Sequence, residues 1–200
     1  TRSDACLVYL PERDGGDLVL RASQIQHTGE VGRLHLRPGE GITGWVAEHR
    51  SVVAIPYSAY KDERFKRFSS LVEDTYEAVL SAPLLSAGAV IGVINVHHKD
   101  PHPHSPEEVA MMVYLGQQIG GVIARARLEE EKMEIERRLE TRKLIERAKG
   151  VLQRAANLTE EEAYLRLRNE SRRTRRPMRE LAEAILLADS LGRFDNSLAG

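Results

Sequence analysis

Residues 105–154 read SPEEVAMMVYLGQQIGGVIARARLEEEKMEIERRLETRKLIERAKGVLQR, with no proline after Pro106. Ser105 is a favourable N-cap, Pro106 suits the first helical position, and the two glutamates that follow complement the positive end of a helix dipole. The stretch therefore predicts one long helix, and 50 residues of unbroken helix would extend roughly 75 Å. A globular domain in a chain of 200 residues cannot cover such a helix. We therefore expect part of it to project and to find a partner.

Apolar side chains separate a packed part of this stretch from a projecting part. The first set recurs at alternating spacings of three and four residues, as one face of a helix does: Met112, Leu115, Ile119, Val122 and Ala126. The second set follows a narrow stripe through residues 129–140, of which 9 of 12 are charged: Leu128, Met133, Ile135 and Leu139. This second stripe predicts a short two-stranded coiled coil over residues 127–141. The alternative is a solvated single helix, stabilised by pairs such as Glu134 with Arg138.

The chain before this helix alternates short apolar runs with turn signals, which predicts an antiparallel sheet. The predicted strands are residues 5–10, 18–23, 52–55, 78–85 and 90–98. The first two and the last two of these are joined by short turns that contain glycine, so each pair is expected to form a hairpin. Ile42, Trp45, Val46 and His49 recur at helical spacing and predict a short helix. Pro83 suggests an edge position or a bulge, because proline cannot donate a ladder hydrogen bond.

Two further short helices are predicted after the long one. Asn157 is a favourable helix stop, and Thr159 with Glu162 has the spacing of a capping box. Pro177 then suits the start of the last helix, which is expected to end near Gly192. Three short amphipathic segments form only a small hydrophobic core, so we expect this unit to pack against a second copy of the chain.

The charge is distributed unevenly, although the whole chain has a net charge of only −1. Residues 141–180 hold 12 basic against 6 acidic side chains, a net of +6. A local excess of this kind is typical of a surface that binds a polyanion. A solvated helix surface would look the same in the sequence.

The composition excludes several classes of protein. Cys6 is the single cysteine, so no intramolecular disulfide and no cysteine-rich zinc site can form, which fits a reducing compartment. No uninterrupted apolar run approaches the roughly 20 residues that span a bilayer, and the chain begins without a charged-then-apolar leader. We therefore expect a cytoplasmic protein with no membrane partner.

Four histidines gather before the long helix: His97, His98, His102 and His104. Imidazoles spaced in this way can bind Ni²⁺ or Zn²⁺. Two prolines interrupt the segment, however, and a polar loop between a strand and a helix is the commoner interpretation. We therefore predict no metal site. The chain also lacks a P-loop, a G-x-S-x-G elbow and an H-E-x-x-H motif, so we predict no catalytic residues and no cofactor.

The first part of the chain resembles a GAF domain. The matching segments are residues 37–48 (RPGEGITGWVAE), 54–56 (AIP), 62–65 (DERF), 82–85 (APLL), 91–96 (IGVINV) and 105–108 (SPEE). The resemblance implies an α+β fold, in which helices flank both faces of a six-stranded antiparallel sheet and a pocket holds a small molecule. The candidate ligand-binding residues are Trp45, Tyr57, Tyr60, Phe65 and Phe68. Core packing is the alternative role for these aromatic side chains.

Three specialised activities of GAF domains are disfavoured by the residues present. Reduction of free methionine sulfoxide needs several cysteines, whereas this chain has one. Cys6 is poorly placed to attach a bilin, and the N-K-x-F…D-E signature associated with cyclic nucleotides is missing. A sensory or purely structural GAF domain remains.

The last part of the chain resembles an ANTAR domain, the RNA-binding output module of transcription antitermination regulators. The matching residues are Arg142, Ile145, Ala148-Lys149-Gly150, Leu152, Thr159-Glu160-Glu161-Glu162-Ala163-Tyr164, Leu167-Arg168 and Leu181-Ala182. This resemblance implies binding of paired RNA hairpin loops in nascent transcripts. The candidate RNA-binding residues are Arg142, Lys143, Arg147, Lys149, Gly150, Arg154, Tyr164, Arg168, Arg172, Arg175 and Arg176.

Two of these candidates have an equally good structural explanation. Tyr164 can stack on a loop base or fill the small core of the helical unit. Gly150 costs about 1 kcal/mol relative to alanine in a helix, which a close approach by RNA or by another helix would explain.

The sequence thus predicts a GAF sensory domain at residues 1–126, a coiled-coil linker helix at 127–141, a three-helix ANTAR domain at 142–192 and a tail at 193–200. The leading hypothesis is a homodimeric, signal-responsive RNA-binding antitermination regulator. The alternatives are a DNA-binding regulator with the same layout, a small-molecule-binding GAF scaffold, and an enzyme acting at the GAF pocket. A missing helix-turn-helix pattern disfavours the first alternative, and a missing nucleophile–base pair disfavours the last.

Overall fold

The computed structural model describes the chain except for residues 1–2, 13–14, 25–27, 67, 69–75 and 193–200, so the predicted tail lies outside the described residues. The chain divides into two compact units, Thr1–Leu128 and Glu129–Gly200. None of the described helices is both long enough and apolar enough to cross a membrane.

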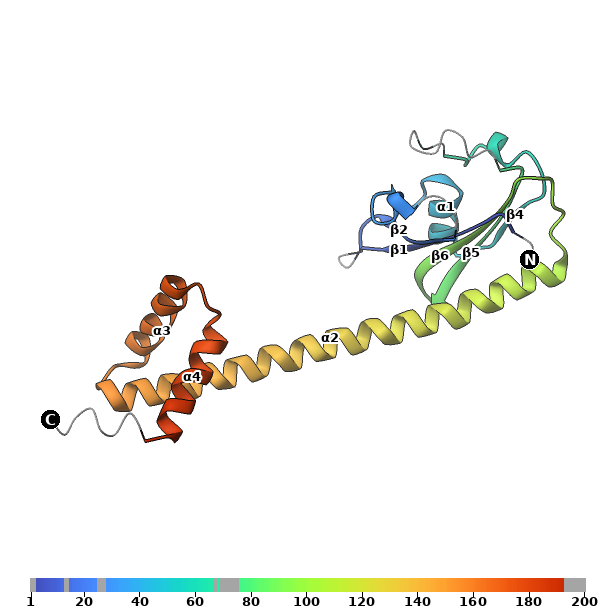
Figure 1. The fold of residues 1–200 in the computed structure, drawn as a ribbon. Coiled ribbons are helices and arrows are strands. Elements are labelled where there is room, and N and C mark those ends of the chain that lie inside the picture. Colours follow the sequence, from blue (N-terminus) through green and yellow to red (C-terminus); the bar gives the residue numbers. More distant parts are fainter. Residues whose placement is uncertain (1–2, 13–14, 25–27, 67, 69–75, 193–200) are drawn as a thin grey trace. The chain divides into compact units, whose positions relative to one another are not determined.

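The first unit is built on a six-stranded sheet (Figure 1). Its strands are β1 (Ala5–Pro11), β2 (Leu18–Gln24), β3 (His35–Leu36), β4 (Val53–Ile55), β5 (Ala78–Ser86) and β6 (Ala89–His98). They lie in the order β3-β2-β1-β6-β5-β4, and every neighbouring pair is antiparallel. Both predicted hairpins are confirmed. The two-residue strand β3 has too short an apolar pattern to be predicted.

Helices cover both faces of this sheet (Figure 1). The short helix α1 (Gly41–His49) lies over one face, where Ile42 and Val46 pack in a core with Val79 of β5. The long helix α2 (Pro106–Ala156) lies over the other face, where Met112 packs against Leu80. Neighbouring β5 residues thus belong to opposite cores, as the pleat of a strand dictates. Two short 3-10 helices complete the unit: η1 (Thr28–Glu30) and η2 (Ala59–Lys61).

Pro83 lies where the sheet can accept it. Strand β5 is an inner strand over Val79–Ser81, but β4 pairs with no residue beyond Ser81. At Pro83 the neighbour in the sheet is therefore β6 alone, so the missing N–H breaks no ladder to β4. A register shift between Leu84 and Leu85 follows directly.

The face of α2 that packs on the sheet differs from the predicted stripe. Met112 is buried and Ile119 packs in the same core, but Leu115 is 40% exposed and Val122 is 69% exposed. Ala126 is exposed as well, so only part of the predicted stripe packs on the sheet. Two glycines explain the difference, because Gly116 and Gly120 turn toward β5 and bring the two backbones together. A Cβ on Gly116 would lie 2.5 Å from the carbonyl oxygen of Pro83, and one on Gly120 would collide with the backbone of Leu85.

This contact gives a testable prediction for stability. Gly116→Ala should lower the free energy of unfolding of the first unit by about 1–3 kcal/mol, because the added methyl must push α2 away from β5. Gly121→Ala is the matched control: nothing lies within 4 Å of its added Cβ, so the better helix propensity of alanine should raise stability by about 0.5–1 kcal/mol. Urea unfolding followed by the fluorescence of Trp45, the only tryptophan, measures both. Equal shifts in the two variants would contradict the close contact.

The second unit contains the C-terminal part of α2, α3 (Glu160–Thr174) and α4 (Met178–Ser190). Its small core consists of Leu152, Ala163 and Leu167, with Ile145, Leu158, Met178, Leu181 and Ile185 packed around them. The helix stop and the capping box predicted between α2 and α3 are confirmed. Asn157 adopts a left-handed φ of 50° just after α2, and Thr159 forms the complete capping box with Glu162.

Candidate functional site

A row of polar side chains crosses the sheet face that α1 covers. The side-chain amide of Asn95 in β6 donates a 2.8 Å hydrogen bond to Oγ1 of Thr43 in α1. The hydroxyl of Ser81 in β5 donates to Oδ1 of the same asparagine at 2.5 Å. All three residues are buried. The row therefore places fixed hydrogen-bonding groups inside an otherwise apolar layer.

His97 continues this row, two residues beyond Asn95 on the same strand. Both ring nitrogens are buried without a hydrogen-bond partner among the described residues, and the ring packs 4.7 Å from that of Tyr76, centroid to centroid. Burial, with a smaller effect from the nearby charge of His98, lowers the pKa of His97 to about 4. The imidazole is therefore neutral at pH 7 and offers one donor and one acceptor.

The predicted aromatic ligand-binding residues do not form one wall. Trp45, Phe65 and Phe68 pack against the core on the α1 side. The Trp45 ring also stacks on His49 at 4.1 Å, and Tyr57 is 66% exposed. Tyr60 is half-buried. Core packing thus accounts for three of the five aromatics.

A recess between α2 and α3 lies on the basic part of the second unit. It has a volume of about 560 Å³. Its lining is Glu134, Arg137, Arg138, Thr141, Arg142, Ile145, Glu146 and Tyr164. Tyr164 is 39% exposed, so it is not the core residue that one interpretation of the sequence suggested. Arg137 and Arg138 were missed because the predicted basic region began at residue 141.

The exposed tyrosine begins a row of cations on α3. Tyr164, Arg168 and Arg172 are four residues apart in turn, which places them on one helix face. Arg172 is exposed, whereas Nε of Arg168 is buried without a hydrogen-bond partner among the described residues. The row carries an aromatic ring and two guanidinium groups, the two kinds of group that bind unstacked bases and phosphates.

Lys149 has a different environment from the other predicted RNA-binding cations. Its Nζ lies 2.8 Å from a carboxylate oxygen of Glu146 and 2.8 Å from one of Glu160. Its side chain is only 8% exposed, and the hydrogen bonds to both glutamates raise its pKa. The structure thus assigns Lys149 to joining α2 to the first turn of α3, rather than to an open phosphate-binding surface.

Gly150 has open space beside it. A Cβ added there would meet only Nη1 of Arg154, at 3.8 Å. No close contact between described helices therefore requires a glycine at this position.

The remaining predicted cations lie on the surface of the second unit. Arg142, Lys143, Arg147, Arg154, Arg175 and Arg176 are all exposed. Arg154 is 3.8 Å from Asp189, and Arg175 holds the left-handed turn after α3 with a φ of 55°. Of this group, Arg142 shares the recess with Tyr164.

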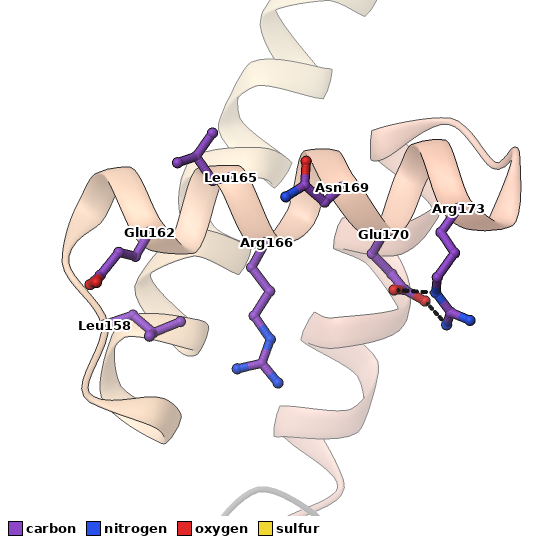
Figure 2. A pocket seen from close by; sticks show the side chains of 7 residues that line it. All are labelled: Leu158, Glu162, Leu165, Arg166, Asn169, Glu170 and Arg173. Carbon is purple, nitrogen blue, oxygen red and sulfur yellow. Dashed lines mark hydrogen bonds and ion pairs between the residues drawn. The ribbon is translucent and has the colours of Figure 1, made fainter.

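A second, shallow groove along α3 has a volume of about 440 Å³. Figure 2 shows the side chains that line it. These are Leu158, Glu162, Leu165, Arg166, Asn169, Glu170 and Arg173. Nε of Arg173 donates to Glu170 at 2.9 Å. Its two arginines are balanced by two glutamates, so this groove attracts a polyanion less than the recess beside Tyr164 does.

Comparison with protein families identifies both units. A GAF domain model matches residues 1–123, and an ANTAR domain model matches residues 133–186. The chain belongs to the GAF family, and an ANTAR domain follows its GAF domain. The ANTAR match begins inside the predicted linker at residues 127–141, so the predicted domain boundaries stay predictions.

Solved structures support the fold of the GAF domain. The GAF domain of a phosphoenolpyruvate-protein phosphotransferase from Coxiella burnetii is 29% identical, with a TM-score of 0.60 over 64% of this chain and 76% of that one. The corresponding domain from Acinetobacter is 29% identical, with a TM-score of 0.57 over 65% and 76%. A type II free methionine-R-sulfoxide reductase from Thermoplasma acidophilum shares the fold at 17% identity, with a TM-score of 0.51 over 62% and 81%. No curated protein matched the chain.

Each of the two candidate sites lies in one of the two matched domains. The polar row of Thr43, Ser81, Asn95 and His97 lies in the GAF domain, and the recess beside Tyr164 lies in the ANTAR domain. Neither family is a catalytic one. The chain thus combines a sensor domain with an RNA-binding output domain.

Proposed function

We propose that this GAF–ANTAR chain is a signal-responsive regulator of transcription antitermination that binds hairpin loops in nascent RNA. The observation that carries this proposal is the exposed ring of Tyr164 in a recess that also contains Arg137, Arg138 and Arg142. A loop base stacks on the tyrosine, and the arginines neutralise the phosphates on either side of it. Recognition of an RNA loop by binding alone requires no catalytic residue.

Two observations favour a loop over a regular duplex. RNA sequence is read in loops, because their unstacked bases are accessible to side chains. The recess, at about 560 Å³, has the size of a pocket for a small molecule such as a single base. Arg168 and Arg172 extend the cationic surface along α3, where the strand that leaves the loop would run.

The active species is a homodimer formed through α2. Leu128, Ile135 and Leu139 are 52–66% exposed, and at about 100° per residue they fall within about 40° of one another around the helix axis. Met133 belonged to the stripe predicted from the sequence, but at about 100° per residue it lies roughly 140° from Leu128 and so off this line. An exposed apolar line with seven- and four-residue spacing is the seam of a two-stranded coiled coil. Each dimer would then present two ANTAR domains to two loops.

The signal is a small polar molecule on the α1 face of the GAF sheet. His97 offers hydrogen-bonding groups there, because both of its ring nitrogens are buried without a partner among the described residues. A ligand that binds one conformation of the GAF domain more tightly would shift the domain toward that conformation. The position of α2 would shift with it, because α2 packs on the opposite face of the same sheet. As a regulator of nascent transcripts, the chain would act in the cytoplasm.

A competition experiment with the full chain tests the RNA-binding function. Labelled hairpin RNA bound to the protein should be displaced by unlabelled hairpin RNA, and at least tenfold less effectively by duplex DNA of the same sequence. The reason is that a regular duplex hides the base faces that Tyr164 would stack on. The two competitors must be compared at the same salt concentration and at the same concentration of nucleic-acid phosphate groups. The reason is that contacts to these phosphates make the affinities salt-dependent. Equal displacement by duplex DNA would favour the DNA-binding alternative.

A further inference from the structure

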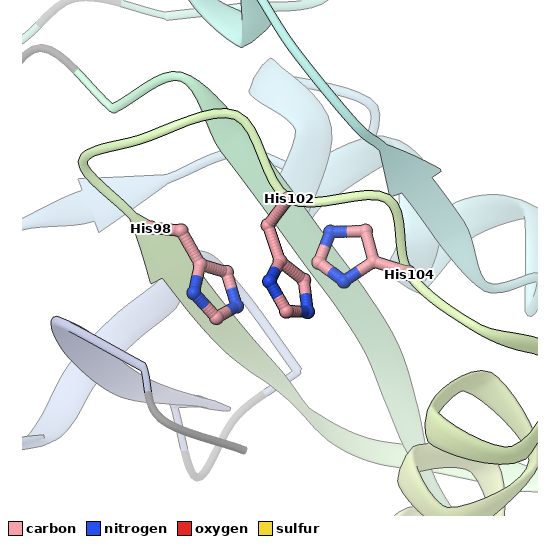
Figure 3. Close-up of side chains that lie close together, drawn as sticks. All are labelled: His98, His102 and His104. Carbon is pink, nitrogen blue, oxygen red and sulfur yellow. The ribbon is translucent and has the colours of Figure 1, made fainter.

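Three histidine rings converge where the GAF sheet ends and α2 begins. His98 is the last residue of β6, and His102 and His104 lie in the loop that leads to Pro106. One ring nitrogen from each histidine lies within 4.8 Å of the other two. The rings of His98 and His102 stack with centroids 4.0 Å apart, and that of His104 is 5.0 Å from His102 (Figure 3).

The loop that carries these rings is held in place by the rest of the domain. The backbone N–H of His102 donates to the carbonyl of Pro56 at 2.8 Å. The backbone N–H of Lys99 donates to Oδ2 of Asp4, also at 2.8 Å. The three rings are therefore positioned by two separate parts of the chain, rather than lying on an unsupported loop.

Several nitrogens of the cluster lack good hydrogen bonds. His98 is only 4% exposed, and its Nε2 is buried without a partner among the described residues, as are both ring nitrogens of His104. The Ile55 backbone lies near His104, but not in a well-formed hydrogen bond. Burial of an unsatisfied polar nitrogen is unfavourable, so a ligand that accepts these lone pairs would stabilise the domain.

We propose that His98, His102 and His104 bind one divalent first-row transition-metal ion of the zinc class. Three neutral imidazoles form a common zinc ligand set with one open position. Ligand atoms on a tetrahedral ion at about 2.0–2.1 Å are roughly 3.4 Å apart. The rings of His98 and His102 stack at an angle of only 8°, so these side chains must rotate out of the stack before their lone pairs can point at one ion. The sequence had favoured a polar loop, because spacing alone did not show that rings on a strand and a loop would meet.

Glu108 gives the site a supporting residue. Nε2 of His102 lies 3.1 Å from both carboxylate oxygens of Glu108, which leaves Nδ1 of that ring for the ion. A carboxylate that holds the second nitrogen of a histidine is the usual support in metal sites. Glu108 also caps α2, because Oε2 accepts from the N–H of Ser105 at 3.0 Å and its own N–H donates to Oγ of Ser105 at 3.2 Å. A bound ion would thus fasten the start of α2 to the end of β6.

Metal titration of the untagged full chain tests this site in the absence of RNA. After removal of metals with a chelator, calorimetry with Zn²⁺ should give one ion per chain, and Co²⁺ should give the visible absorption of a tetrahedral site. His102→Ala should weaken Zn²⁺ binding at least tenfold, and Glu108→Gln about 10- to 100-fold. His35→Ala is the matched control, because His35 is an exposed histidine on β3 of the same domain. It should bind Zn²⁺ as the wild type does.

Two outcomes would overturn the site: no stoichiometric Zn²⁺ binding, or equal affinities in wild type and His102→Ala. Circular dichroism checks that each variant is folded, and His104→Ala replaces any variant that is not. Zn²⁺ should also raise the melting temperature of the wild type but not of His102→Ala. None of these measurements involves RNA, so failure of the metal site leaves the RNA-binding proposal intact, and the reverse is also true.

Discussion

An RNA that carries two hairpins in tandem should bind the full chain about 10²- to 10⁴-fold more tightly than the same RNA with one loop deleted. In a dimer joined through α2, each ANTAR domain takes one loop. Once the first loop is bound, the second binds within the same complex at a high effective concentration, so no new contact is needed for the gain. Affinities measured at one fixed salt concentration provide the test, because the phosphate contribution changes with salt.

Dimer-breaking variants show whether this gain comes from two linked modules. Glutamate at Ile135 and Leu139 together should halve the mass seen by light scattering and abolish the gain from the second hairpin. The affinity for one hairpin should stay nearly unchanged. Met133→Glu is the matched control, since Met133 is equally exposed, at 68%, but lies off the apolar line. Equal affinities for one and two hairpins, or a gain that survives in the monomeric variant, would contradict the model.

Helix boundaries were the part of the fold that the sequence specified best. Ser105 with Glu108, and Thr159 with Glu162, form their capping hydrogen bonds as the spacing predicted. Asn157 ends α2 in a left-handed conformation. These signals are readable because a cap involves residues only three apart, and the physics that fixes it is local.

The buried face of α2 could not be predicted in the same way. Hydrophobic periodicity marked Met112, Leu115, Ile119 and Val122 alike, and it did not show that α2 contacts the sheet at Gly116 and Gly120. A glycine adds nothing to an apolar pattern, and its importance appears only when a second backbone lies against it. The ion pair of Lys149 with Glu160 could not be predicted either, because Glu160 belongs to another helix, α3. The pair with Glu146 lies within α2.

The candidate sites show the same division between local and tertiary information. Tyr164 was identified from its motif, while its exposure depends on how α3 packs against α2. Asn95 and His97 were overlooked because alternate polar residues in a strand usually face solvent. In this sheet both faces are covered by helices, so these polar side chains are buried and need partners.

Replacing Tyr164 with leucine should weaken hairpin binding by about 1–3 kcal/mol, or roughly 5- to 150-fold. Leucine keeps apolar contact with the recess but has no ring face on which a base can stack. Because the tyrosine side chain is 39% exposed, the melting temperature should change little. Tyr164→Phe keeps the ring and should bind nearly as the wild type does.

The salt dependence of binding separates stacking from phosphate neutralisation at this recess. Arg142→Ala should lower the slope of log affinity against log salt by roughly one, because one phosphate contact is lost. Tyr164→Leu should shift the line downward and leave its slope unchanged, because stacking releases no counterions. Binding by Tyr164→Leu at wild-type strength would refute the stacking role. A loss of affinity that is accompanied by a clear fall in melting temperature would instead show that Tyr164 acts by holding α3 against α2.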